Sequence, residues 1–117
     1  MELKRVYCKH FPFAGYKAFT LCPWVFIREK AKQRYTPTCH RHETTHALQQ
    51  IETLWVLFFI IYGLEYVIKL CCCFNTDKAY RSVSFEQEAY ATQGKVDYND
   101  NRKHYAWVKY VFTLYNK

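Results

Sequence analysis

Residues 36–53 read TPTCHRHETTHALQQIET, and this stretch decides the fold because it predicts the helix around which the other elements are arranged. Thr36 is a typical N-cap residue, whose side chain accepts a hydrogen bond from a backbone N–H of the first turn. Pro37 suits the first helical position, where a backbone N–H is not needed. We therefore expect a helix from about residue 37 to residue 53.

The centre of this helix carries the pattern H-E-x-x-H, formed by His42, Glu43 and His46. Two His residues four positions apart lie on one helix face, so both imidazoles can reach a single metal ion. Glu43 is turned about 100° away from His42, beside the ion, where a base can act on an activated water molecule. The pattern predicts a site for one zinc ion. The alternative is a polar helix face rich in His, with His40 included and no metal.

A catalytic zinc site with two His ligands needs a third protein ligand and an open fourth position. Residues 85–90 read FEQEAY and offer Glu86 as that ligand. On a helix, Glu86 shares a face with Ala89, whose small side chain allows a close approach to the His helix. Glu88 is the second candidate, although it lies two residues from Glu86 and would face elsewhere on a helix.

Further polar residues could complete such a site. Gln49 and Gln50 extend the His helix by one more turn and could orient the ligands through hydrogen bonds, or they could simply face solvent. An oxyanion donor is also expected near the metal. The candidates for that donor are Tyr90, Tyr98, His104 and Tyr105, none of which the sequence singles out. The alternative for each is a role in packing or at the surface.

H-E-x-x-H followed on a later helix by E-x-x-A, here Glu86 to Ala89, resembles the gluzincin metallopeptidases, in which Glu is the third zinc ligand. The order of the parts is similar too, with strands before the metal helix and an apolar helix before the E-x-x-A helix. The chain looks like the smallest, single-domain members of that group, including small proteins of Bacteroidetes type. Tyr90 stands where many gluzincins have Asp.

The resemblance implies a zinc-binding α+β domain with peptidase activity. It implies that His42, His46 and Glu86 bind zinc. Glu43 would then be the general base that takes a proton from the zinc-activated water and delivers it to the leaving amine. It also implies that the strand 24–28 lies at a sheet edge, where an extended peptide or protein substrate could pair with it. The alternative is an ordinary core strand.

The first third of the chain predicts a small β-structure within a single domain over residues 1–117. Residues 1–16 are expected to be irregular, with a turn over residues 11–15. Residues 17–29 are rich in β-branched and aromatic side chains and predict two short strands. Pro23 divides them and is expected in a turn or at an edge.

Residues 54–74 predict a mostly apolar helix in which Glu65 and Lys69 are the charged residues. These two residues are four positions apart and can pair on a helix. The length is close to that of a membrane span, but a charge near the centre of a span is costly. The helix is therefore expected to be buried in the core or to lie on a membrane or a partner, with a true span as the alternative.

The last third predicts one more clear helix. Residues 75–77 are expected to break the apolar helix. Ser82 or Ser84 could cap a third-ligand helix from about residue 85 to residue 95. Residues 102–115 are expected to form a last helix or an extended segment.

Composition excludes several classes of protein. With 117 residues, 50% of them apolar and 20% aromatic, the chain is neither disordered nor of low complexity. The net charge of +7 comes from residues 1–41, whereas residues 42–74 are slightly acidic. No helix-turn-helix, zinc-finger or other known nucleic-acid motif is present, which argues against a nucleic-acid partner. A basic segment beside an apolar helix fits an anionic membrane surface or an acidic partner better.

The cysteines and the N-terminal residues predict a cytoplasmic protein, or one at the cytoplasmic face of a membrane. The six Cys form no C-x-x-C pair, and three of them are adjacent at residues 71–73, which disfavours both a zinc knuckle and disulfide bonds. The chain starts with basic residues but lacks the continuous apolar stretch of a secretory signal.

The sequence thus favours a zinc-dependent metallopeptidase with Glu43 as general base. The alternative is a zinc-binding or partner-binding module without hydrolytic activity, because a small domain has little surface from which a substrate cleft could form. Membrane association through residues 54–74 is compatible with either function.

Overall fold

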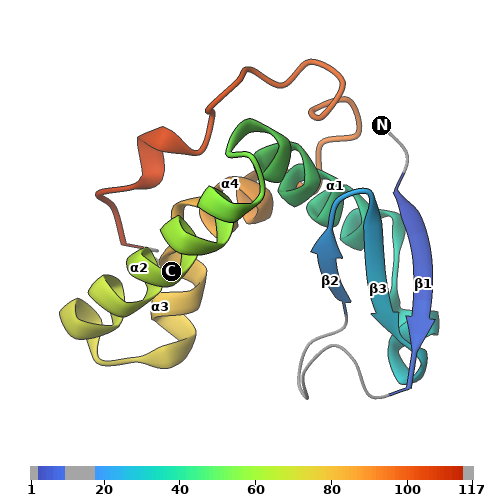
Figure 1. Cartoon of the computed structure of the whole chain (residues 1–117), viewed down its shortest axis with the longest axis horizontal. Coiled ribbons are helices and arrows are strands. Elements are labelled where there is room, and N and C mark those ends of the chain that lie inside the picture. Colours follow the sequence, from blue (N-terminus) through green and yellow to red (C-terminus); the bar gives the residue numbers. More distant parts are fainter. Residues whose placement is uncertain (1–2, 10–17, 115–117) are drawn as a thin grey trace.

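In the computed structural model, residues 3–9 and 18–114 are described, and they form a small sheet and several helices. The strands are β1 (Lys4–Cys8), β2 (Ala18–Leu21) and β3 (Trp24–Arg28). The α-helices are α1 (Pro37–Glu52), α2 (Val56–Cys73), α3 (Thr76–Ser82) and α4 (Ser84–Thr92), and short 3-10 helices are η1 (Glu29–Arg34) and η2 (Val108–Tyr110). The sheet lies on one side of α1, and the other α-helices lie on its other side (Figure 1). The expected α+β class is confirmed.

The sheet has the strand order β1-β3-β2, with β1 parallel and β2 antiparallel to β3. This order corrects one prediction and decides between two alternatives for another segment. The segment expected to be irregular, residues 1–16, contains β1. Residues 24–28 form the central strand, which agrees with an ordinary core strand and not with the edge strand that the resemblance implies. Lys4 and Arg5 are both exposed, so β1 lacks the alternating pattern of a half-buried strand, and its parallel pairing with β3 depends on contacts that are distant in sequence.

The two strands predicted within residues 17–29 are β2 and β3, and Pro23 lies in the turn between them. The turn predicted over residues 11–15 falls outside the described residues. Val25 and Ile27 of β3 are fully buried and pack with Ala47 of α1. This small apolar core holds the sheet against the helix that carries the H-E-x-x-H pattern.

Helix α1 begins and ends close to the predicted residues. The Thr36 hydroxyl oxygen accepts a hydrogen bond of 3.2 Å from the Cys39 N–H, and Pro37 is the first helical residue, so the predicted cap is confirmed. After Glu52 the chain turns sharply, with positive φ at Leu54 and Trp55. This turn separates α1 from α2 and lets α2 run in a new direction (Figure 1).

Helix α2 ends at Cys73, so the predicted break of the apolar helix before residues 75–77 is confirmed. The prediction missed the additional helix α3, which starts there because the Asn75 side chain accepts a hydrogen bond from the Lys78 N–H and caps it. Neither Ser82 nor Ser84 caps α4: Ser82 is the last residue of α3, and Ser84 is the first of α4. Helix α4 ends at Thr92, three residues before the predicted end.

The chain after α4 forms turns and the short helix η2 rather than the predicted long helix or extended segment. It runs back across the helices (Figure 1), and the carbonyl of Tyr110 in η2 accepts a hydrogen bond of 3.2 Å from Lys69 on α2. Trp107 packs on Phe85, with ring centroids 4.6 Å apart. Together with Phe58 and Val83, these rings form a second apolar core. This core holds α4 against α2.

Candidate metal centre

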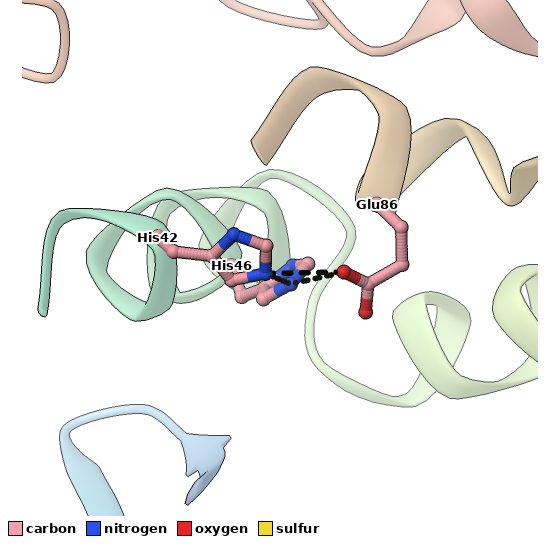
Figure 2. A group of neighbouring side chains, drawn as sticks. All are labelled: His42, His46 and Glu86. Carbon is pink, nitrogen blue, oxygen red and sulfur yellow. Dashed lines mark hydrogen bonds and ion pairs between the residues drawn. The ribbon is translucent and has the colours of Figure 1, made fainter. Parts of the chain in front are cut away.

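Three side chains from two helices meet at one point. His42 and His46 come from α1, and Glu86 comes from α4 (Figure 2). The Nε2 atoms of the two His lie 3.2 Å apart, and the Glu86 Oε1 atom lies 3.1 Å from the first and 3.2 Å from the second. All three residues are buried. The spacing that suggested these residues in the sequence thus corresponds to a compact group in the fold.

Both His rings are held by a hydrogen bond on the opposite nitrogen. The Nδ1 atom of His42 lies 2.8 Å from Oε1 of Gln93, and that of His46 lies 2.8 Å from Oε1 of Gln49. A carboxamide oxygen can only accept, so each Nδ1 carries the proton. In the neutral form of each imidazole, Nε2 then directs a lone pair toward the common point, which is the tautomer that a metal ligand needs.

The orientation of Gln49 is fixed independently of His46. Its Nε2 donates hydrogen bonds of 3.0 Å to the Phe85 carbonyl and 2.9 Å to Oε1 of Glu88, and both partners are acceptors. The carboxamide oxygen must therefore face the imidazole. Gln49 links the metal helix to α4, as the sequence interpretation anticipated for an orienting residue.

Glu86 is the third member of the group and is held by α2 as well as by the His residues. Its second oxygen, Oε2, accepts a hydrogen bond of 2.7 Å from the hydroxyl of Tyr62 on α2. Burial alone would raise the pKa of Glu86, but the charge and hydrogen bonds of His46 and His42 hold it well below its usual range. Glu86 is therefore a carboxylate at neutral pH, which is the form that binds a metal.

The charge of Glu86 also acts on His46. Burial lowers the pKa of His46, but the neighbouring carboxylates, that of Glu86 first, outweigh this and raise it to about 9. In the absence of a cation, a proton on His46 would compensate the buried carboxylate. A divalent ion can take the place of that proton, because metal binding releases protons from its ligands.

The residues present fit a zinc ion. Two imidazole nitrogens and one carboxylate oxygen are a ligand set of catalytic zinc sites. Bonds of about 2.0–2.1 Å to a tetrahedral ion place ligand atoms roughly 3.3–3.4 Å apart, close to the 3.1–3.2 Å found between the three ligand atoms. Of the described His, Cys, Asp and Glu residues, these three form a group of metal-binding geometry.

Glu43 lies beside this group on the side of the sheet. It follows His42 directly in α1, is half-buried, and accepts a hydrogen bond of 2.6 Å at Oε1 from the hydroxyl of Thr20 on β2. Its carboxylate is close enough to contribute to the raised pKa of His46 and that of Tyr90. The strand thus positions the side chain that the sequence suggested as a base.

Tyr90 is the oxyanion candidate that lies nearest to the metal group. Its ring centroid is 4.6 Å from that of His42. Burial, and secondarily the charge of Glu86, raise the pKa of Tyr90, so its hydroxyl stays protonated at neutral pH and can donate a hydrogen bond. Tyr80 of α3 shares a hydrogen bond with it.

The structure places Glu88 away from the metal group. Its carboxylate binds the guanidinium of Arg102 with distances of 2.6 and 2.9 Å, and accepts a hydrogen bond of 2.6 Å from Tyr98. Arg102 also binds both oxygens of Glu52, at 2.9 and 3.0 Å. Glu88 is therefore not brought together with the two His, and Tyr98 bonds Glu88. Through Gln49, however, this buried ion network reaches His46.

Three other candidates also have different roles from those predicted. The Gln50 carboxamide bonds the Thr20 carbonyl and the Cys22 N–H at 2.6 and 2.7 Å, so it fastens β2 to α1 instead of orienting a ligand. The His104 side chain is 86% exposed, and its Nδ1 lies 3.2 Å from Glu52. Tyr105 is also exposed.

Sequence reasoning did not identify several residues of the site. Gln93 could have been found, because it lies seven residues after Glu86 and thus two helical turns further along the same face. Tyr62, Thr20 and Arg102 gave no such signal, because their contacts with the site depend on how the elements pack.

A comparison of the chain with protein-family models, with curated proteins and with solved structures found no match in any of the three.

Proposed function

We propose that this chain is a zinc-dependent metallopeptidase that hydrolyses peptide bonds. The observation that carries the proposal is the convergence of His42 Nε2, His46 Nε2 and Glu86 Oε1, with both imidazole tautomers set by carboxamide oxygens. The resemblance of H-E-x-x-H and E-x-x-A to the gluzincin pattern supports the same proposal. Zinc bound there would supply Lewis acidity, polarising a carbonyl and acidifying a water molecule.

Glu43 would move the protons of the reaction. It is the half-buried carboxylate next to the ligands, and the hydroxyl of Thr20 holds one of its oxygens. A carboxylate fixed in this way can accept a proton from the attacking water and return it to the leaving amine. Tyr90, packed on the ring of His42 with its hydroxyl protonated, is the best placed donor to a developing oxyanion.

The test is to measure zinc content and peptide hydrolysis in the same preparations. The proposal expects one zinc ion per chain and cleavage of a mixed peptide library by the wild-type protein. Glu43→Gln keeps an oxygen for Thr20 and all three ligands, so it should retain zinc while hydrolysis falls by about 10²–10⁴-fold. His42→Ala removes a ligand and should lose zinc and hydrolysis together.

Glu29→Gln is the matched control, because Glu29 is exposed and lies in η1 rather than beside the metal group. It should retain both zinc and activity. Hydrolysis by Glu43→Gln at the wild-type rate would refute the proposed role of Glu43, and a wild-type protein that binds no zinc would refute the proposal as a whole.

A zinc-binding module without hydrolytic activity is the second candidate. The observation that favours it is the burial of all three ligands between α1 and α4, where an ion would join the two helices. A structural zinc site is closed to substrate, whereas a catalytic site keeps a position open. A protein that holds one zinc ion, unfolds on chelation and cleaves no peptide of the library would establish this second function.

A further inference from the structure

Helix α2 exposes an apolar face along its whole length. It is the helix that, within the described residues, is long and apolar enough to cross a membrane, with a mean hydropathy of 2.0, yet only 17% of its residues are buried. At 100° per residue, its exposed large side chains lie on one half of the helix surface. They are Val56, Leu57, Phe59, Ile60, Leu64, Val67 and Ile68. We call this set the α2 apolar face.

The two charged residues of α2 point away from this face. Lys69 Nζ lies 3.0 Å from Glu65 Oε1, and both side chains are buried. Lys69 also donates to the carbonyls of Ser82 and Tyr110, and Glu65 accepts from the Ser84 N–H at 2.9 Å. The protein therefore neutralises the charges of α2 internally and presents lipid-like surface outward, the reverse of an ordinary surface helix.

The surface of the described residues is basic overall. Lys78 is exposed in the first turn of α3, just beyond the end of α2 and next to the exposed Asp77. Among the described residues, four acidic side chains are buried, while most Lys and Arg residues face solvent. The buried acids are Glu52, Glu65, Glu86 and Glu88. The surface is therefore more basic than the net charge of +7 indicates.

We propose that the α2 apolar face docks on an anionic lipid bilayer, with α2 lying in the plane of the membrane interface. An exposed apolar helix face on a protein with a net charge of +7 fits an interface of acidic headgroups and acyl chains. The opposite side of α2 packs on α1, α3 and α4 and holds the charged pair, so only one half of the helix can contact lipid. This geometry fits a helix that lies on the bilayer rather than one that crosses it.

Helix α2 also contacts the residues of the candidate metal centre. The hydroxyl of Tyr62 on α2 donates to Glu86, and the ring of Phe58 lies 6.1 Å from that of His46. A bilayer bound to the outer face of α2 would therefore lie one helix away from the ligands. The proposal itself does not depend on hydrolysis or on zinc, since its test measures lipid binding.

The experiment is co-sedimentation of the full chain with two kinds of vesicle, phosphatidylcholine alone and phosphatidylcholine mixed with phosphatidylserine. The wild-type protein should sediment with the mixed vesicles and more weakly with the neutral ones. Ile60→Glu and Ile68→Glu each place a charge on the face and should weaken binding at least about tenfold. Lys78→Ala should weaken binding to the mixed vesicles only, by about fivefold.

Val96→Glu is the matched control, because Val96 is 72% exposed but lies outside α2. It should bind vesicles like the wild type. Circular dichroism and thermal unfolding check that each variant is folded, which is expected because Ile60 and Ile68 are exposed. Size-exclusion chromatography is run in parallel to detect self-association.

Two outcomes would overturn the proposal. One is a wild-type protein that stays in the supernatant with both kinds of vesicle. The other is a wild-type dimer that Ile60→Glu converts to a monomer without any vesicle binding, which would assign the face to a second copy of the chain.

Discussion

At the scale of single residues, the candidate metal centre depends on two carboxamides as much as on the three residues proposed as ligands. A neutral imidazole binds metal through the nitrogen that has no proton, and the partner of the other nitrogen selects the tautomer. Gln93 and Gln49 do this for His42 and His46. Neither carboxamide carries a charge, so the net charge of the centre is set by Glu86 and the ion alone.

Gln93→Leu tests this role directly. It removes the acceptor for His42 Nδ1 and frees the ring to turn, so zinc affinity should fall by about 10–100-fold. Gln93→Glu keeps an oxygen acceptor and should restore most of the affinity. Competition with a chromophoric chelator measures the zinc dissociation constant. Gln33→Leu, at an exposed position of η1, should leave that constant unchanged; equal constants for Gln93→Leu and wild type would contradict the argument.

At the scale of elements, α1 and α2 reverse the usual relation between polarity and burial. Helix α1 buries polar residues, among them Thr45, His46 and Gln49, whereas α2 exposes apolar ones. These polar groups can be buried because each has a hydrogen-bond partner. Gln49, for example, makes hydrogen bonds to three other residues. The exposed apolar face of α2 has no such explanation within the chain, and a bilayer would provide one.

The sequence predicted α1, its cap and the residues that meet at the metal centre, because those features depend on local pattern and helical period. It failed for β1, whose pairing with β3 joins distant segments. It also missed α3: residues 75–77 do end the apolar helix, but Asn75 is in addition the cap of a new helix. The role of Glu88 depends on Arg102, which reaches it from a segment without regular structure.

The ion network around Arg102 is a further element-scale feature that can be tested. Arg102 joins Glu52 of α1 to Glu88 of α4, and all three side chains are buried. Arg102→Met leaves two buried carboxylates without a cation and should lower the free energy of unfolding by about 3–5 kcal/mol. Urea denaturation measures this loss. Lys103→Met changes the exposed neighbouring residue and should have almost no effect; similar losses for both variants would argue against the network.

At the scale of the whole molecule, two small apolar cores lie on either side of the polar residues of α1. One core joins the sheet to Ala47 of α1, and the other joins α2, α4 and the C-terminal segment around Phe85. Between them lie the metal ligands and the hydrogen bonds of Gln49. Phe19 of β2 stacks on Phe59 of α2, and the hydrogen bonds and ion pairs of the polar layer add to this contact. A bound ion would join the layer further.

Under the proposed function, removal of zinc should destabilise the fold, because the ion would bind the native arrangement of ligands and not the unfolded chain. Free zinc at about a thousand times its dissociation constant should add about 4 kcal/mol to the free energy of unfolding. Thermal unfolding with and without a chelator should show the difference as a lower midpoint in the chelated protein.

His42→Ala should unfold at the same temperature in both conditions, since it has lost a ligand. His104→Ala, which changes an exposed His outside the centre, should keep the dependence on zinc. If the midpoint temperature of unfolding of the wild-type protein changed with neither zinc nor chelator, the polar layer would be held together without an ion.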